Sequence, residues 1–88
     1  MKKIEYGGNK NIIGRRLEKL RREKRMSQEQ LAAKMQTLNV NMDQQMVSRI
    51  ERNLRIVTDY EMACFCRILH VTERDMLRDF YENLENKK

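Results

Sequence analysis

The chain has 88 residues, enough for one small domain with a modest hydrophobic core. It contains no proline and only three glycines, and it is rich in Leu, Met, Glu, Gln, Lys and Arg, so we expect an all-α protein. Because no apolar run is long enough for a membrane span and no signal-peptide core is visible, we expect a cytoplasmic protein with no membrane partner.

The formal net charge of +6 is unevenly distributed along the chain. Residues 1–25 hold ten lysines and arginines against three acidic residues, whereas residues 57–88 hold five against seven. The basic end can attract a polyanion, and the acidic end would be repelled by it. Charge alone leaves two interpretations equally open: nucleic-acid binding, or a basic surface that only keeps the protein in solution.

Residues 1–11 have the composition of a flexible basic arm, because two adjacent glycines weaken any helix there. A first helix should follow, with Asn9 or Asn11 as its cap and an end near Lys24 or Arg25, where clustered cations suit a helix C-terminus. Its apolar residues recur at helical spacing: Ile13, Leu17 and Leu20.

The second helix should begin at Ser27, which forms a capping-box pattern with Gln30. Its apolar stripe consists of Leu31, Ala32, Met35 and Leu38. A connector from Gln36 to Met42 follows, and we expect Val40 or Met42 to enter the core.

The third helix is predicted over residues 43–52, because Asp43 is a good N-cap. Its buried positions should be Val47 and Ile50, and Asn53 suits a left-handed terminator. The positions that solvent or a ligand can reach are Gln44, Gln45, Ser48 and Arg49.

Two more helices are predicted in the last third of the chain. Thr58 with Glu61 should open the fourth, and Thr72 with Asp75 the fifth, by the same capping logic. The inner stripe of the fourth helix consists of Met62, Phe65, Cys66 and Leu69. The apolar residues of the fifth are Met76, Leu77 and Phe80. Residues 83–88 form a polar tail.

Nothing in the chain suggests an enzyme, a metal site or a cofactor. Cys64 and Cys66 lie two positions apart on a helix, so their side chains point to different sides and cannot readily pair. His70 has no second histidine or acid at ligand spacing, and a helix terminator is the better interpretation. No nucleophile–base pattern or phosphate-binding glycine loop is present.

The segments "IGRRLEKLRREKRMSQEQLAAKM" and "VSRIERN" occur in order between Ile13 and Phe80. Together they resemble the helix-turn-helix domain of phage repressor and Cro proteins, the XRE family. The resemblance implies a compact five-helix, lambda-repressor-like domain over residues 12–82. The connector between its second and third helices is extended relative to the short turn usual in this fold.

The resemblance also implies roles for individual residues. The helix of residues 43–52 becomes the recognition helix, with base-reading positions at Gln44, Gln45, Met46 and Arg49. Phosphate contacts are implied for Gln28, Ser48, Arg52, Asn53 and Arg55. An ion pair between Arg21 and Glu51 would join the first and third helices. Glycine is frequent in the family where this chain has Gln36, Asn53 and His70.

Side-chain chemistry supports some of these roles and leaves others open. A glutamine amide offers a donor and an acceptor that match adenine N6 and N7, although paired glutamines alone are more often ordinary solvated residues. Met46 could touch a thymine methyl group or be a plain surface methionine. Arg49 could reach guanine or phosphate, and phosphate is favoured because such contacts are the more frequent.

The function predicted from these observations is sequence-specific binding of double-stranded DNA by a transcriptional regulator of the repressor type. A homodimer on a two-fold operator is expected, joined through the apolar stripe Leu77, Phe80, Tyr81 and Leu84, although the same residues could equally close the core of the monomer. The alternatives are a protein-interaction module with the same fold, such as an antitoxin or adaptor, and a non-specific nucleoid or RNA binder. No small-molecule ligand is evident.

Overall fold

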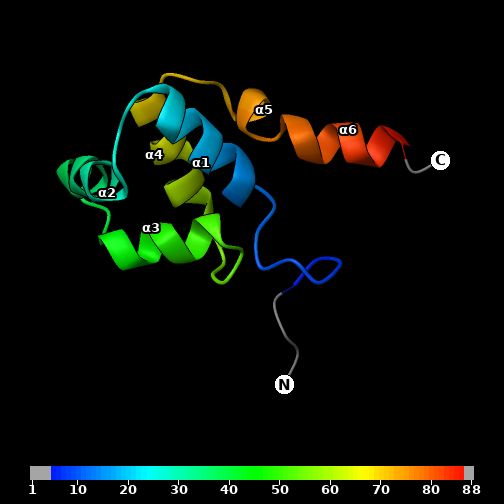
Figure 1. Cartoon of the computed structure of the whole chain (residues 1–88), viewed down its shortest axis with the longest axis horizontal. Coiled ribbons are helices and arrows are strands. Elements are labelled where there is room, and N and C mark those ends of the chain that lie inside the picture. The colour runs from blue at the N-terminus through cyan, green and yellow to red at the C-terminus, as the bar shows by residue number, and fades with distance from the viewer. Residues whose placement is uncertain (1–4, 87–88) are drawn as a thin grey trace.

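The computed structural model describes residues 5–86, and the regular structure in that range is helical apart from one isolated bridge between Tyr6 and Asn9. The predicted all-α class is therefore confirmed for this part of the chain. The helices are α1 (Gly14–Glu23), α2 (Gln28–Thr37), α3 (Gln44–Glu51), α4 (Asp59–Leu69), α5 (Glu73–Met76) and α6 (Arg78–Asn86) (Figure 1). Within residues 5–86, none of them combines the length and the apolar character that a membrane span needs.

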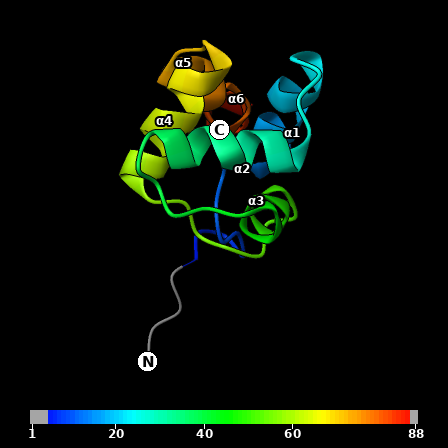
Figure 2. The same cartoon turned by 90° about the vertical axis from the view of Figure 1, so that its left-hand side faces the viewer.

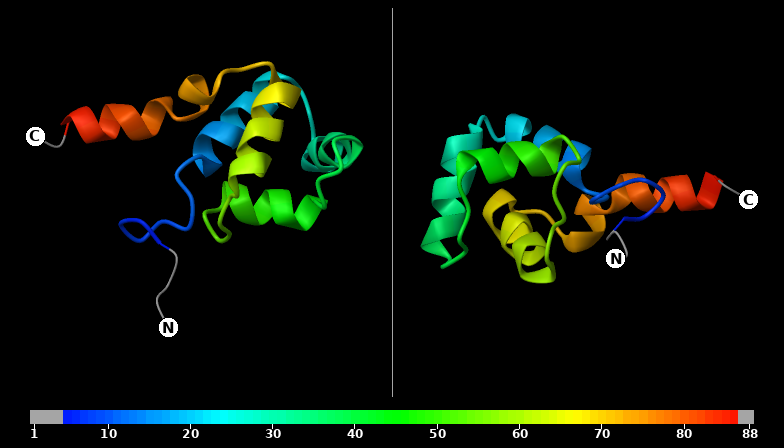
Figure 3. Two further views of the ribbon diagram at one scale, coloured as in Figure 1. Left: turned by 180° about the vertical axis from the view of Figure 1, so that it is seen from behind. Right: turned by 90° about the horizontal axis from the view of Figure 1, so that it is seen from below.

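Helices α1 to α5 surround one hydrophobic core, and α6 projects from this body toward the C-terminus (Figures 1 and 3). Helix α2 packs on α3 and α4, and α1 packs on the same two helices (Figure 2). The largest fully buried side chains come from all five helices and the α2–α3 connector: Phe65, Leu17, Leu31, Met35, Met42, Ile50, Leu69, Met76 and Val47.

Side-chain caps set the start of most helices. In α2 the Ser27 hydroxyl accepts a hydrogen bond from the Gln30 amide at 3.0 Å, and the Gln30 side chain accepts one from Ser27 at 2.8 Å. Asp43 caps α3 at the amide of Met46, 2.8 Å away. Thr58 and Thr72 cap α4 and α5 in the same way. The caps fall where the sequence predicts them because they depend only on residues three positions apart.

The connector between α2 and α3 belongs to the core. Helix α2 runs through Thr37, so Gln36 lies in its last turn, where the side-chain amide donates to the carbonyl oxygen of Met42 at 2.8 Å. Val40 and Met42 are both buried, where the sequence analysis expected one of the two. Asn39 makes the turn with a φ of 64°, in the left-handed region that asparagine tolerates.

The C-terminal part differs from the prediction of one fifth helix. The chain leaves α5 at Leu77 and continues as α6, so residues 5–86 contain six helices rather than five. Tertiary contacts account for the division. Met76 is fully buried, and Arg16 of α1 holds Asp75 at 3.1 Å, which directs α5 toward the body. Helix α6 has no buried residue, and its half-buried Phe80 packs on Tyr6 of the N-terminal segment instead of entering the core.

The segment before α1 forms a turn in which Tyr6 and Asn9 exchange two backbone hydrogen bonds of 2.9 Å. Gly7 and Gly8 have φ angles of 55° and 84°, which only glycine adopts readily. The Tyr6 ring packs edge-to-face on Phe80 with ring centres 5.6 Å apart. Residues 1–4 of the predicted arm and residues 87–88 of the predicted tail lie outside the described residues.

Candidate nucleic-acid interface

Helix α3 has an inner side and an outer side. Val47, Ile50 and Glu51 are buried against the body, whereas Gln44 and Gln45 are exposed. Figures 1 and 2 show α3 at the edge of the body, with its outer side open. The outer side also carries the exposed Arg49, whose Nη2 lies 3.4 Å from the carbonyl oxygen of Leu54, and the half-buried Met46 and Ser48. Met46 packs against the core, so only part of its side chain can meet a ligand.

A buried ion pair fastens α3 to α1. Arg21 Nε lies 2.7 Å from Glu51 Oε2, and Arg21 Nη2 lies 3.0 Å from Glu51 Oε1. Arg21 Nη1 also donates to the carbonyl oxygen of Met26 at 2.7 Å. The hydrogen bond with Glu51 raises the pKa of the Arg21 guanidinium. Both side chains are buried, so removal of either one would leave an uncompensated charge and loosen the base of α3.

Gln28 joins this ion pair to the outer side of α3. Its Nε2 donates to Glu51 Oε1 at 2.9 Å, and its Oε1 accepts from Gln44 Nε2 at 2.7 Å. The contact holds the Gln44 amide nitrogen against Gln28 of α2. The Gln28 side chain is thus occupied, while the first turn of α2 still presents the backbone N–H groups of a helix N-terminus.

The predicted phosphate-binding residues in the loop after α3 differ in whether their side chains already have partners within the protein. Arg52 is exposed and forms no ion pair within residues 5–86. The Asn53 side chain is instead used internally. Its Oδ1 accepts from the amides of Lys10 and Asn11 at 2.8 and 3.2 Å, and its Nδ2 donates to Asn9 Oδ1 at 2.7 Å.

Arg55 is also engaged within the protein. Its Nη1 and Nη2 each lie 3.0 Å from a carboxylate oxygen of Glu61, and Nη1 donates to the carbonyl oxygen of Ile56 at 2.9 Å. Hydrogen bonding to Glu61 raises the pKa of Arg55. Burial acts to raise the pKa of Glu61, but hydrogen bonds from Arg55 and Thr58 outweigh it, and the net pKa is lowered. A DNA phosphate would have to compete with Glu61 for this arginine.

Asn11 is a positioning residue that the sequence analysis considered only as a helix cap. Its Oδ1 does cap α1, accepting from the amides of Ile13 and Gly14 at 3.0 and 2.7 Å. Its Nδ2 also donates to the carbonyl oxygens of Ile50 and Arg55, each at 2.9 Å. One side chain thereby ties the start of α1 to the end of α3 and to the next loop. The partners lie far away along the chain, so no local pattern signals this role.

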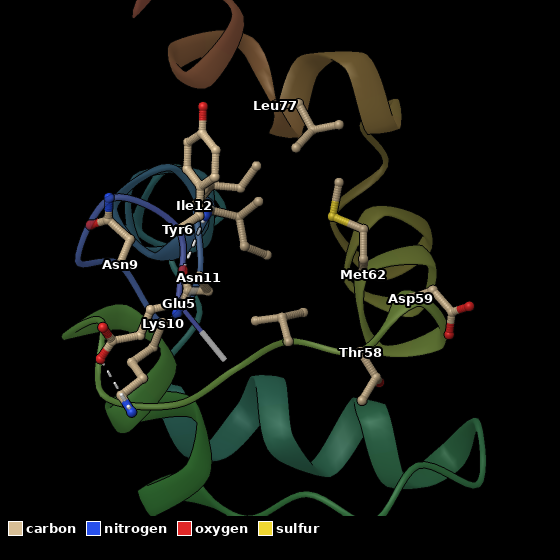
Figure 4. Close-up of a pocket in the computed structure, with 12 residues that line it drawn as sticks. Glu5, Tyr6, Asn9, Lys10, Asn11, Ile12, Thr58, Asp59, Met62 and Leu77 are labelled. Carbon is tan, nitrogen blue, oxygen red and sulfur yellow. Dashed lines mark hydrogen bonds and ion pairs between the residues drawn. The ribbon is translucent and has the colours of Figure 1, made fainter. Parts of the chain in front are cut away.

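An apolar groove of about 510 Å³ lies between the N-terminal segment and helices α4 and α5 (Figure 4). Tyr6 and Ile12 line one side, and Met62 and Leu77 line the other. Its charged residues include Glu5 and Lys10, which pair with each other at 3.7 Å. The groove lacks a converging set of polar groups that would orient a small molecule.

Neither a reactive thiol at Cys66 nor a metal site is found among the described residues. Burial raises the pKa of Cys66 to about 11, so this thiol stays protonated at neutral pH and acts as a small core residue. Among residues 5–86, no group of three or more His, Cys, Asp or Glu side chains is placed to hold a metal ion.

The apolar stripe proposed for dimer contact is partly covered by the same chain. Leu77 and Phe80 are half-buried, and Phe80 packs on Tyr6 and on Tyr81. Tyr81 and Leu84 remain 39% and 45% exposed, and Arg74 lies over the Tyr81 ring with its Cζ 5.6 Å from the ring centre.

The comparison with known families agrees with this architecture. A family described as helix-turn-helix matches residues 17–75, which include all of α2, α3 and α4. Among curated proteins, none matches the chain. The matched range contains the outer side of α3 together with Arg21 and Gln28, which contact Glu51 at its end.

Proposed function

Because the chain belongs to the helix-turn-helix family, of the phage repressor and Cro (XRE) type, we propose that it is a cytoplasmic repressor that binds double-stranded DNA. The observation that carries the proposal is the exposure of polar side chains on the outer side of α3. The buried ion pair between Arg21 and Glu51 holds this helix against α1. A rigid polar helix of this kind suits insertion into a major groove.

Within this proposal, Gln44, Gln45, Met46 and Arg49 read base edges. Gln45 is the best placed, since its amide has no protein hydrogen bond within residues 5–86 and can pair with adenine through both its donor and its acceptor. Gln44 offers its acceptor and one of its two amide hydrogens, because the other is donated to Gln28.

Backbone phosphates are held by Gln28, Ser48, Arg52, Asn53 and Arg55. Arg52 contributes most to phosphate binding, because it is exposed and unpaired among the described residues, whereas Arg55 is already hydrogen-bonded to Glu61. Asn53 acts chiefly by keeping the loop in place through its contacts with residues 9–11. Gln28 acts through the N–H groups at the start of α2.

A homodimer binds a two-fold operator whose half-sites lie about 34 Å apart, one turn of duplex. The two copies meet through α6 and the preceding Leu77, with the exposed Leu84 and Tyr81 at the centre of the contact and Leu77 and Phe80 beside them. Leu84→Asp should give a folded monomer with much weaker operator binding, since Leu84 is exposed and the two half-sites would no longer be linked. Sedimentation of the wild-type protein as a monomer at all concentrations would exclude this interface.

Selection of bound duplexes from a random pool, followed by measurement of the mass of the complex, tests the whole proposal. A two-fold consensus bound by two copies supports it. Enrichment of no sequence, with a steep salt dependence, would favour a non-specific nucleic-acid binder. Absence of DNA binding would favour a protein-interaction module, although the polar outer side of α3 argues for DNA.

A further inference from the structure

A second cleft lies at the C-terminal end of α3. It has a volume of about 770 Å³ and is bounded by the start of α1, the loop after α3 and the start of α6. Three arginines line it: Arg15 and Arg16 from α1, and Arg52 from the α3–α4 loop. Two acids, Glu51 and Asp79, line it as well.

The charges in this cleft are not equally available. Arg16 is held by Asp75 at 3.1 Å, and Glu51 is held by Arg21 and Gln28. Arg15 and Arg52 are exposed, and neither forms an ion pair within residues 5–86. Asp79 likewise has no cationic partner in that range. The cleft therefore presents two free cations, with one free acid on the wall formed by α6.

The cleft complements the other end of α3. Helix α3 has 8 residues. At 1.5 Å per residue a helix of that length spans about 12 Å, close to the width of about 12 Å of a B-DNA major groove. In an orientation that lays α3 across the groove with its N-terminal end, beside Gln28, at one strand, its C-terminal end lies near the opposite strand. A cationic cleft at that end is placed to meet the second backbone.

We propose that Arg15 and Arg52 together hold the phosphate backbone opposite Gln28, so that α1 forms part of the DNA-binding surface. The inference rests on the proposed DNA-binding function and adds Arg15 to its contact residues. The loop that bears Arg52 is held close to the start of α1, because the Asn53 side chain is hydrogen-bonded to Asn9, Lys10 and Asn11.

The test compares three variants of the full chain on a selected duplex and on a random duplex between 50 and 200 mM salt. Arg15→Gln should weaken binding to both duplexes and lower the salt slope by about 0.9, so that the affinity lost over this fourfold salt range is roughly 3.5-fold smaller than for wild type. Asp79→Asn should strengthen binding to both duplexes, most at low salt, by removing a repulsive charge.

Arg67→Gln is the matched control, since Arg67 is exposed on α4 and lines a different surface with Lys34 and His70. This variant makes the same change of charge and should leave the slope as in wild type. If the wild-type protein binds DNA but Arg15→Gln behaves like Arg67→Gln, the cleft has no backbone contact and the inference is wrong. If the wild-type protein binds no duplex at all, the proposed function itself fails.

Discussion

The arginines that attach α3 and α4 to neighbouring parts of the chain differ in their partners from the polar side chains on the outer side of α3 and in the loop after it. Arg21 and Arg55 each form two hydrogen bonds with a buried carboxylate, Glu51 or Glu61. Gln45 and Arg52 are exposed and have no such partner among the described residues. The first group contributes to the stability of the domain, and the second is available to a ligand.

The difference separates two roles that the composition of the chain cannot distinguish. Arginines occur in both groups, and their chemical type is the same. What distinguishes them is whether a carboxylate lies within reach in the folded protein. Substitutions in the first group should lower the free energy of unfolding, and substitutions in the second should lower DNA affinity while the protein stays folded.

The largest effect is expected for Glu51→Ala. The change leaves the buried Arg21 guanidinium without its carboxylate, so unfolding in urea should show a loss of about 3–5 kcal/mol. Glu18→Ala is the control, because the Glu18–Arg22 pair at 2.9 Å is largely exposed and should contribute less than about 1 kcal/mol. Equal losses of unfolding free energy for the two variants would contradict the distinction between buried and exposed ion pairs.

Glu61→Gln should lower stability by about 1.5–3 kcal/mol at neutral pH, because it removes the charge from two hydrogen bonds with Arg55. Since the pKa of Glu61 is lowered in the folded protein, its ionised form stabilises the fold above the ordinary value of 4.5. That stability is lost as the pH falls from this value through the lower pKa of the folded state.

Thermal unfolding of wild type and Glu61→Gln at a series of pH values measures this loss. The two melting temperatures should converge in acid and separate at neutral pH. Glu85→Gln, on the exposed α6, is a charge-matched control and should not reproduce the convergence. A constant difference between wild type and Glu61→Gln across this range would mean that the carboxylate charge is unimportant to the fold.

Gln45→Ala should weaken binding to the selected operator by about 1–3 kcal/mol and leave binding to a random duplex unchanged. The free energy of unfolding should also be unchanged, because Gln45 is exposed. Titrations of both duplexes, with urea unfolding in parallel, provide the measurement. A similar loss on both duplexes would show that Gln45 contacts the backbone rather than a base.

The smallest effect should be a gain in stability from His70→Gly. His70 ends α4 with a φ of 56° and a ψ of 45°, a left-handed conformation that is unfavourable for most residues. Glycine adopts it freely, and after its larger entropy in the unfolded chain is allowed for, the gain should be about 0.5–1 kcal/mol.

DNA affinity should not change in this variant, since His70 lies on a different part of the surface from α3. Asn39→Gly serves as the comparison. Asn39 has a similar φ of 64°, but asparagine tolerates this region, so the gain should be smaller. A loss of stability in His70→Gly would show that the imidazole has a role beyond ending the helix.

The helical class and the starts of most helices could be predicted from the sequence, because they depend on short-range physics. The capping residues Ser27, Asp43, Thr58 and Thr72 each act on an amide three positions ahead, and the apolar spacing shows which side of each helix is buried. The exposure of Gln44 and Gln45 follows from the same spacing.

Which polar groups are free was decided by the tertiary structure alone. Arg55 and Asn53 look as available as Arg52 in the sequence, yet Glu61 and the turn at Asn9 occupy them. The division of the fifth helix at Leu77 and the second function of Asn11 likewise depend on contacts between distant parts of the chain. Local patterns determine where a helix begins and which side is apolar, because those preferences lie within one turn. The partner of a charged side chain depends on how the helices pack, and that geometry is set by the whole core.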